Sequence, residues 1–285
     1  IGKSHIQHGA SRNSIVPFRG EGAFETPHEE HWWQIYQPPY PEDYHSTTFV
    51  TERTIDQIER KSNDNEPWLI WSSFPDPHHP MTPPGRWFEK YRPSEMPLPS
   101  SRTDKLDGAP EHLHNFQSIH PKDQRQWVAP CGFGSDELLR EAIAATYGMI
   151  EMIDNGIGKI LKSLEDTQQL DNTIIVFTSD HGDMMGDHGL FLKGFMHYRG
   201  TLQVPLMVRA PGIEAQENHE LASSIDIGPT LLELCELPFY EGIQGETLVP
   251  ILLGDKKSVR DCVLIEDDIA TVTHVNQSSR SSCSI

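Results

Sequence analysis

A short strand followed at once by ionisable side chains is the chemically richest feature of this 285-residue sequence. The apolar, β-branched run Ile174–Phe177 predicts a strand that is buried on both faces. Asp180 and His181 come directly after it, and in open α/β sheets ligands bind beyond the carboxyl ends of the strands. Carboxylate oxygen and imidazole nitrogen are donors for a divalent metal, and Lys193 downstream would face an anion bound to that metal. The alternative interpretation is a plain polar turn.

Two further polar clusters are associated with buried elements. Lys3 and His5 stand at the start of the chain, and His78 and His79 follow a second predicted strand at Trp68–Ser73. Lysine supplies positive charge for an oxyanion, and histidine can give a proton to a leaving alkoxide. Each of these residues alone is explained as well by a solvated surface group or a hydrogen bond within a loop. Together with the metal-type cluster, they fit the binding and cleavage of a tetrahedral, negatively charged ester.

Composition limits the classes of function. The chain has 42 acidic and 23 basic residues, which argues against non-specific binding to nucleic acid. No apolar run approaches the length of a membrane span. The four cysteines, Cys131, Cys235, Cys262 and Cys283, lack CxxC or other metal-type spacing. This usage favours buried or free thiols over a disulfide framework, and with them a reducing compartment such as the cytoplasm.

Predicted helices alternate with the predicted strands. A short helix is expected over Thr51–Arg60, and a long one begins after Ser135 as N-cap. A third strand is expected at Val204–Arg209 and a further amphipathic helix over Ser224–Leu237. The long helix carries an apolar stripe that is expected to cover the sheet, formed by Leu139, Ile143, Tyr147, Ile150, Ile153, Ile157, Ile160 and Leu164.

This alternation predicts an α/β fold with a mainly parallel sheet flanked by helices. No internal repeat or linker stands out, so residues 1–285 are expected to form a single domain. The chain begins at Ile1 without an initiator methionine, a cap or a signal peptide, and residues 267–285 are expected to form an irregular tail. We therefore expect a chain truncated at both ends, with an amino-terminal part missing.

Several phrases of the sequence resemble those of sulfatases, a family of the alkaline phosphatase superfamily. Gly2-Lys3-Ser4-His5 resembles the Gly-Lys-x-His element, and Pro77-His78-His79-Pro80 resembles the Pro-His-x-Pro element. Thr178–Gly182 with Leu192-Lys193 resembles the metal-binding strand end and the sulfate-contacting lysine. Weaker phrases recur in the same order, namely Val204-Pro205-Leu206, Ala210-Pro211-Gly212, Asp226-Ile227-Gly228-Pro229-Thr230-Leu231-Leu232 and Gly245-Glu246-Thr247-Leu248.

The resemblance implies a metal and an oxyanion site. Asp180 and His181 would ligate a divalent cation, usually Ca²⁺ in sulfatases, with Mg²⁺ or Mn²⁺ as alternatives. Lys3 and Lys193 would hold the sulfate oxygens. The substrate would be a sulfate ester of a small molecule or a glycan.

The resemblance also implies the proton-transferring groups. His5 and His78 would contact the nucleophile and the leaving group, and His78 would protonate the departing alcohol or phenol. His79 is the alternative acid if the loop is aligned one residue further along. Tyr198 and Arg199 would help to shape the substrate pocket.

One part of the family pattern has no counterpart in the sequence. Sulfatases carry a Cys or Ser in a Cys/Ser-x-Pro/Ala-x-Arg motif, which is converted to formylglycine, and paired aspartates that complete the metal shell. Cys131 does not fit this motif, and Thr82–Arg86 matches its spacing with threonine in place of the nucleophile, which we interpret as coincidence. Since Ca²⁺ takes about six to eight oxygen ligands, two ligands alone bind it poorly. The chain by itself is therefore expected to be inactive, while the complete protein hydrolyses a sulfate ester.

Two other functions remain open. The first is a phosphodiesterase or phosphonate monoester hydrolase, since these enzymes share the fold, the metal and the formylglycine. The second is a non-catalytic remnant that binds sulfated glycans, which the absent nucleophile supports. Paired aspartates and a Cys/Ser-x-Pro-x-Arg motif upstream in the reading frame would exclude the remnant.

Overall fold

The structure is a computed structural model that describes residues 35–64, 66–118, 131–132, 135–193, 196–267 and 282–284. The chain divides into two compact units. Unit 1 comprises Ile1–Leu170 and Asp183–Leu192, and unit 2 comprises Asp171–Gly182 and Lys193–Ile285. The single sulfatase-like domain stays a prediction.

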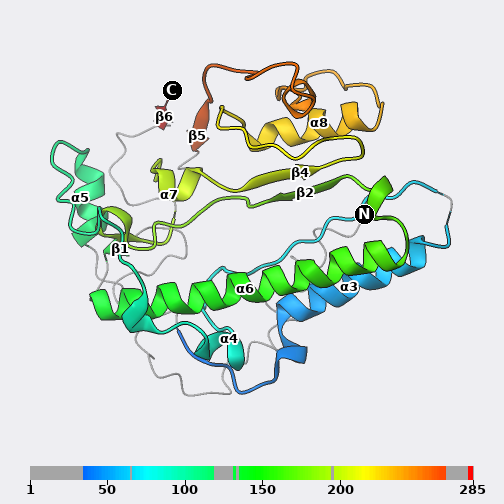
Figure 1. Ribbon diagram of the computed structural model, residues 1–285. Coiled ribbons are helices and arrows are strands. Elements are labelled where there is room, and N and C mark those ends of the chain that lie inside the picture. Colours follow the sequence, from blue (N-terminus) through cyan, green and yellow to red (C-terminus); the bar gives the residue numbers. More distant parts are fainter. Residues whose placement is uncertain are drawn as a thin grey trace. The chain divides into compact units, whose positions relative to one another are not determined.

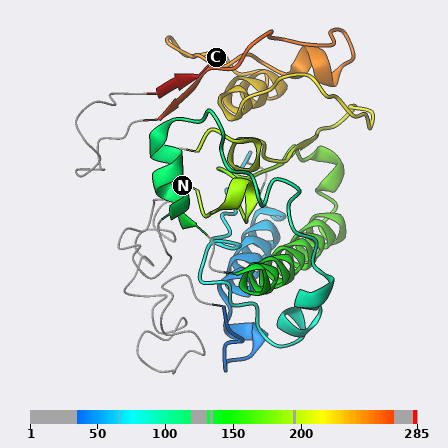
Figure 2. The same cartoon turned by 90° about the vertical axis from the view of Figure 1, so that its left-hand side faces the viewer.

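Two long helices form the frame of unit 1. α3 (Ser46–Lys61) and α6 (Asp136–Asp166) lie side by side in Figures 1 and 2. The Ser135 hydroxyl accepts a hydrogen bond from the Leu138 amide at 3.2 Å, which confirms the predicted N-cap. Shorter elements complete unit 1, namely η1 (Glu42–Tyr44), α4 (Arg86–Glu89), η2 (Pro93–Glu95), α5 (Glu111–Ser118), β1 (Cys131–Gly132), η5 (Asp187–Gly189) and β3 (Leu190–Phe191).

The buried face of α6 differs in part from the predicted stripe. Tyr147 and Ile150 of that stripe are 42% and 47% exposed. The helix contacts both α3 and α4, so its buried arc is wider than one stripe and includes small residues that let the neighbours approach. The buried residues of α6 are Leu139, Ala142, Ile143, Ala144, Ala145, Thr146, Gly148, Met149, Met152, Ile153, Gly156, Ser163 and Leu164.

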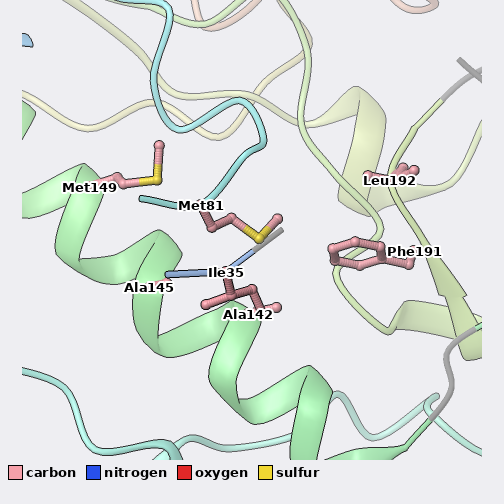
Figure 3. Close-up of a cluster of buried hydrophobic side chains, with 7 residues drawn as sticks. All are labelled: Ile35, Met81, Ala142, Ala145, Met149, Phe191 and Leu192. Carbon is pink, nitrogen blue, oxygen red and sulfur yellow. The ribbon is translucent and has the colours of Figure 1, made fainter. Parts of the chain in front are cut away.

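The hydrophobic core of unit 1 joins α6 to segments far apart in the sequence. Ile35 and Met81 form an isolated parallel bridge, and β3 pairs antiparallel with β1. Figure 3 shows Ala142, Ala145 and Met149 of α6 close to Met81 and Ile35, with Phe191 and Leu192 beyond them. Phe191 is completely buried, so the chain just before Lys193 is anchored in this core.

Two glycines of α6 give a matched stability test. A Cβ atom at Gly148 would lie 2.3 Å from the Trp87 carbonyl oxygen, whereas a Cβ at Gly158 meets nothing within 4 Å. Gly148→Ala should therefore destabilise the protein by about 1–3 kcal/mol, since the backbone of α4 must move. Gly158→Ala should stabilise it by about 0.5–1 kcal/mol through helix propensity. Urea denaturation of both variants measures the difference in their free energies of unfolding. Equal changes in stability would show that the α4 backbone does not restrict the space at residue 148.

Unit 2 is built around one antiparallel strand pair. β2 (Ile175–Thr178) pairs with β4 (Leu206–Arg209), with Thr178 opposite Leu206. The remaining elements are η4 (Leu170–Asn172), which begins at the last residue of unit 1, and α7 (Arg199–Leu202), η6 (Ser224–Asp226), α8 (Ile227–Leu234), α9 (Val249–Leu252) and the antiparallel pair β5 (Ile265–Asp267) with β6 (Ser282–Ser284).

Helices and strands alternate as predicted, but the strand details need correction. The strand pairs within the described residues are antiparallel, because an apolar run predicts a strand without fixing the direction of its partner. β2 is half-buried rather than buried on both faces. Trp68–Ser73 forms no strand, and Leu69 and Trp71 are 75% and 64% exposed, so the prediction of a second buried strand is wrong. β6 lies inside the segment that was expected to be irregular.

Two predictions concern the cysteines and membrane-spanning segments. Cys235 and Cys262 are free and exposed. No helix in the described part of the chain is both long and apolar enough to cross a membrane.

Candidate functional site

Asp180 and His181 stand at the end of β2, where the sequence placed them. The side chains are exposed, by 84% for Asp180 and 43% for His181. One carboxylate oxygen of Asp180, Oδ1, accepts a hydrogen bond from the His181 amide at 2.9 Å. The other oxygen, Oδ2, lies 3.7 Å from His181 Nε2. Two ligands each about 2.4 Å from one cation, and at right angles, would lie about 3.4 Å apart, so this pair fits a shared metal.

The hydrogen bond of the His181 ring fixes its tautomer. Nδ1 lies 2.8 Å from the Gly182 carbonyl oxygen, which can only accept, so Nδ1 carries the proton. In the neutral ring Nε2 then presents its lone pair. A histidine that donates one ring N–H to a backbone carbonyl and offers the other nitrogen is the usual arrangement of a metal ligand.

The backbone after His181 is fixed to α7 within unit 2. The Gly182 amide donates to the Thr201 carbonyl oxygen at 2.8 Å. A Cβ atom at Gly182 would lie 2.0 Å from the Gly200 carbonyl oxygen, so only glycine allows this approach. The buried Thr201 hydroxyl donates to the carbonyl oxygens of Met196 and Tyr198, which ties the preceding turn to α7.

The other predicted site residues of unit 2 follow this turn in the sequence. Lys193 is half-buried and Tyr198 is the N-cap residue of α7. Arg199 is exposed, and its Nε donates to Gln203 Oε1. Arg199 is therefore held by its own helix.

His78 and His79 lie on the proline-rich loop of unit 1. The two rings stack with centroids 3.9 Å apart, and His79 is only 4% exposed while His78 faces solvent. His78 Nδ1 lies 2.7 Å from the His79 carbonyl oxygen, so Nδ1 carries the proton and Nε2 is the basic nitrogen. Of the two candidate acids, His78 is the accessible one.

Gly186-Asp187-His188, which follows Asp180 and His181 closely in the sequence, forms part of a turn of unit 1. His188 Nδ1 donates to Asp104 Oδ2 at 2.7 Å, and the Ser101 hydroxyl donates to Asp187. Gln117 Nε2 donates to the His188 carbonyl oxygen at 3.0 Å. These contacts fix the turn that leads into β3.

Asp104 gives this turn a dependence on pH. The hydrogen bond from His188, followed by the Leu106 amide at 2.9 Å, lowers the pKa of Asp104 below its ordinary value of 3.8. A lowered folded-state pKa contributes stability above the ordinary value, and that contribution is lost as the pH falls through the folded value. Asp104→Asn should therefore lower the melting temperature at pH 7, and the difference from wild type should shrink below about pH 4. The exposed Asp107→Asn is the control, and a difference that stays constant down to pH 3 would contradict the assignment.

The predicted site residues fall into three groups. Asp180, His181 and Lys193 belong to unit 2, and His78 belongs to unit 1. Lys3 and His5 lie outside the described residues. Among the described residues, no group of three or more His, Cys, Asp or Glu side chains is placed to hold a metal ion.

Comparison with known proteins decides the family. The sulfatase family model matches residues 8–237. The chain belongs to the sulfatase family. An arylsulfatase of Clostridium perfringens is 31% identical over 231 residues, which are 79% of this chain and 45% of that protein. A choline-sulfatase of Rhizobium meliloti is 28% identical over 219 residues, which are 74% of this chain and 40% of that protein.

A solved structure supports the same α/β, alkaline-phosphatase-like fold. The phosphonate monoester hydrolase of Agrobacterium radiobacter superimposes with a TM-score of 0.71 at 28% identity, over 86% of this chain and 49% of that one. The chain thus spans about half the length of the relatives it matches. Sulfatases use a divalent metal together with formylglycine.

Sequence reasoning missed two buried polar residues beside the predicted site. Thr201 fixes the Asp180–Gly182 turn, and Asp76 lies buried two residues before His78. Only the prolines around Asp76 marked its loop as rigid, and nothing in the local sequence of Thr201 distinguished it from a surface threonine.

Proposed function

We propose that the complete protein hydrolyses sulfate esters, with a divalent metal held by Asp180 and His181. The observation that carries the proposal is the pair of free donor atoms, Asp180 Oδ2 and His181 Nε2, 3.7 Å apart at the end of β2. Hard oxygen with imidazole nitrogen suits Ca²⁺, Mg²⁺ or Mn²⁺, and Ca²⁺ is our choice. A bound cation would supply positive charge that polarises the sulfate ester.

The remaining residues bind the anion and move a proton. Lys193 and Lys3 would hold sulfate oxygens as point charges, and Arg199 would border the substrate. His78 is proposed to act as the imidazolium and to give its Nε2 proton to the departing oxygen, which leaves the neutral ring with Nδ1–H on the His79 carbonyl oxygen. His5 would contact the nucleophile.

A second candidate function is hydrolysis of phosphate diesters or phosphonate monoesters. The TM-score of 0.71 and 28% identity to a phosphonate monoester hydrolase favour it. Sulfate and phosphoryl groups are both tetrahedral and anionic, so the fold alone does not separate them.

Parallel assays of the complete protein with 4-nitrophenyl sulfate and bis(4-nitrophenyl) phosphate distinguish the two functions. We expect the higher kcat/KM for the sulfate ester. His78→Gln should lower kcat by about 10²- to 10⁴-fold, the usual contribution of a general acid. The exposed His114→Gln on α5 is the matched control and should leave kcat unchanged.

Turnover of the phosphate diester alone would overturn the sulfatase proposal in favour of the second candidate. Binding of sulfated glycan without turnover of either ester would support the non-catalytic remnant instead. An equal loss of kcat in His78→Gln and His114→Gln would show that His78 is not the general acid.

A further inference from the structure

Asp76 is a buried carboxylate on the loop that carries His78. The residue is 6% exposed and its side chain 1% exposed. Burying a charged group costs free energy unless hydrogen-bond donors surround it, so the contacts of Asp76 indicate the structural role of its carboxylate.

The donors that hold Asp76 come from the amino-terminal end of α3. The Thr47 hydroxyl donates to Asp76 Oδ2 at 2.5 Å, and the Ser46 hydroxyl donates to the same oxygen at 3.3 Å. His45 Nδ1, which accepts from the Thr47 amide at 3.3 Å, lies 3.5 Å from Oδ2 and is not one of the donors. The first turn of a 16-residue helix also carries partial positive charge, which favours a carboxylate at this place. Asp76 therefore ties the loop to a long, rigid helix.

The loop itself is too stiff to absorb a change at Asp76. Pro75, Pro77 and Pro80 have fixed φ angles. The His78 amide donates to the Pro75 carbonyl oxygen at 3.2 Å, so the segment is closed into a turn. A displacement of the Asp76 carboxylate would therefore carry the His78 imidazole with it.

We propose that Asp76 is the positioning residue of His78: its carboxylate, held by Thr47 and Ser46, sets where the imidazole stands. This inference rests on the proposed function, in which His78 gives a proton to the leaving group. Displacing a reacting group by about 1 Å can cost about 100-fold in rate, so a buried anchor of this kind has a direct catalytic consequence.

Histidine NMR tests the positioning without any assay of activity. In selectively ¹⁵N-labelled wild-type protein the neutral His78 ring should be the Nδ1–H tautomer, because Nδ1 donates to a carbonyl oxygen. Asp76→Asn and Thr47→Val should both shift the His78 nitrogen signals towards the Nε2–H form. Thr47→Ser keeps the hydroxyl and should restore the wild-type signals. If Asp76→Asn does not fold, Thr47→Val decides the test. Folded variants with unchanged His78 signals would overturn the proposal.

Leaving-group dependence tests the catalytic consequence. A general acid matters most when the leaving group is poor, so Thr47→Val should lower kcat about tenfold or more for phenyl sulfate and less for 4-nitrophenyl sulfate, with KM nearly unchanged. An equal loss for both esters would overturn the positioning of a proton donor. If the NMR signals shift as expected but wild type hydrolyses no sulfate ester, the proposed function fails while the positioning of His78 by Asp76 stands.

Discussion

Replacing Asp226 by alanine is expected to lower the stability of unit 2 by about 3–5 kcal/mol, because it leaves a buried charge without its partner. Asp226 is completely buried, and Arg260 Nη2 donates to its Oδ1. The Glu246 amide also donates to Oδ1 and the Ser223 amide to Oδ2, each at 2.8 Å. One carboxylate thus joins three segments, and its loss leaves three donors without an acceptor.

The neighbouring Thr230 extends this arrangement. Its hydroxyl donates to the Asp226 carbonyl oxygen at 2.6 Å and accepts from the Leu248 amide at 2.8 Å. A Cβ atom at Gly245 would lie 2.2 Å from the Ile225 carbonyl oxygen, so the segment before Glu246 also approaches closely. The two segments of the sequence that contain Asp226 and Gly245 are therefore in contact.

Amide hydrogen exchange measures the effect where it should occur. In Asp226→Ala, the Ser223 and Glu246 amides should exchange faster, and the melting temperature should fall. Asp255→Asn, which changes an exposed carboxylate of the same unit, is the control. Combining Asp226→Ala with Arg260→Met should recover part of the loss, since the unpaired guanidinium is then gone. Unchanged exchange at both amides would mean that Asp226 does not join these segments.

The sequence predicted local features well where one residue controls the outcome. The Ser135 N-cap depends only on the hydroxyl and the helix that follows it, so α6 begins where expected. The placement of Asp180 and His181 after β2 likewise follows from a change from apolar to ionisable residues within a few positions. Both predictions rest on neighbours in the chain.

Predictions that depend on distant partners were less accurate. The segment Trp68–Ser73 has the composition of a buried strand, but its Trp71 is 64% exposed. Burial requires a partner segment, which composition does not specify. His188 is engaged with Asp104, which is 84 positions earlier, and nothing in the sequence near either residue indicates this contact. The buried carboxylates Asp76 and Asp226 were not predicted, because their donors come from other segments. Polar networks of this kind become visible only when the segments are placed together.

The second large effect concerns metal binding at the end of β2. Gly182→Ala is expected to weaken binding of a divalent cation by about 10- to 100-fold, although residue 182 supplies no ligand atom. A Cβ atom there would lie 2.0 Å from the Gly200 carbonyl oxygen, so the turn must move away from α7. The movement breaks the hydrogen bond from the Gly182 amide to Thr201 and displaces the carbonyl oxygen that orients the His181 ring.

Paramagnetic broadening by Mn²⁺ measures this binding even where affinity is low. In wild type, Mn²⁺ should broaden the amide signals of residues 179–182 before others. Asp180→Asn removes the negative charge of this ligand and should abolish that preference. Gly182→Ala should shift the titration to 10- to 100-fold higher Mn²⁺, about the loss expected for a residue that orients a ligand. Gly228→Ala, where a Cβ meets nothing within 4 Å, is the matched control. Broadening that is unchanged in Asp180→Asn would show that Asp180 and His181 are a polar turn and not a metal site.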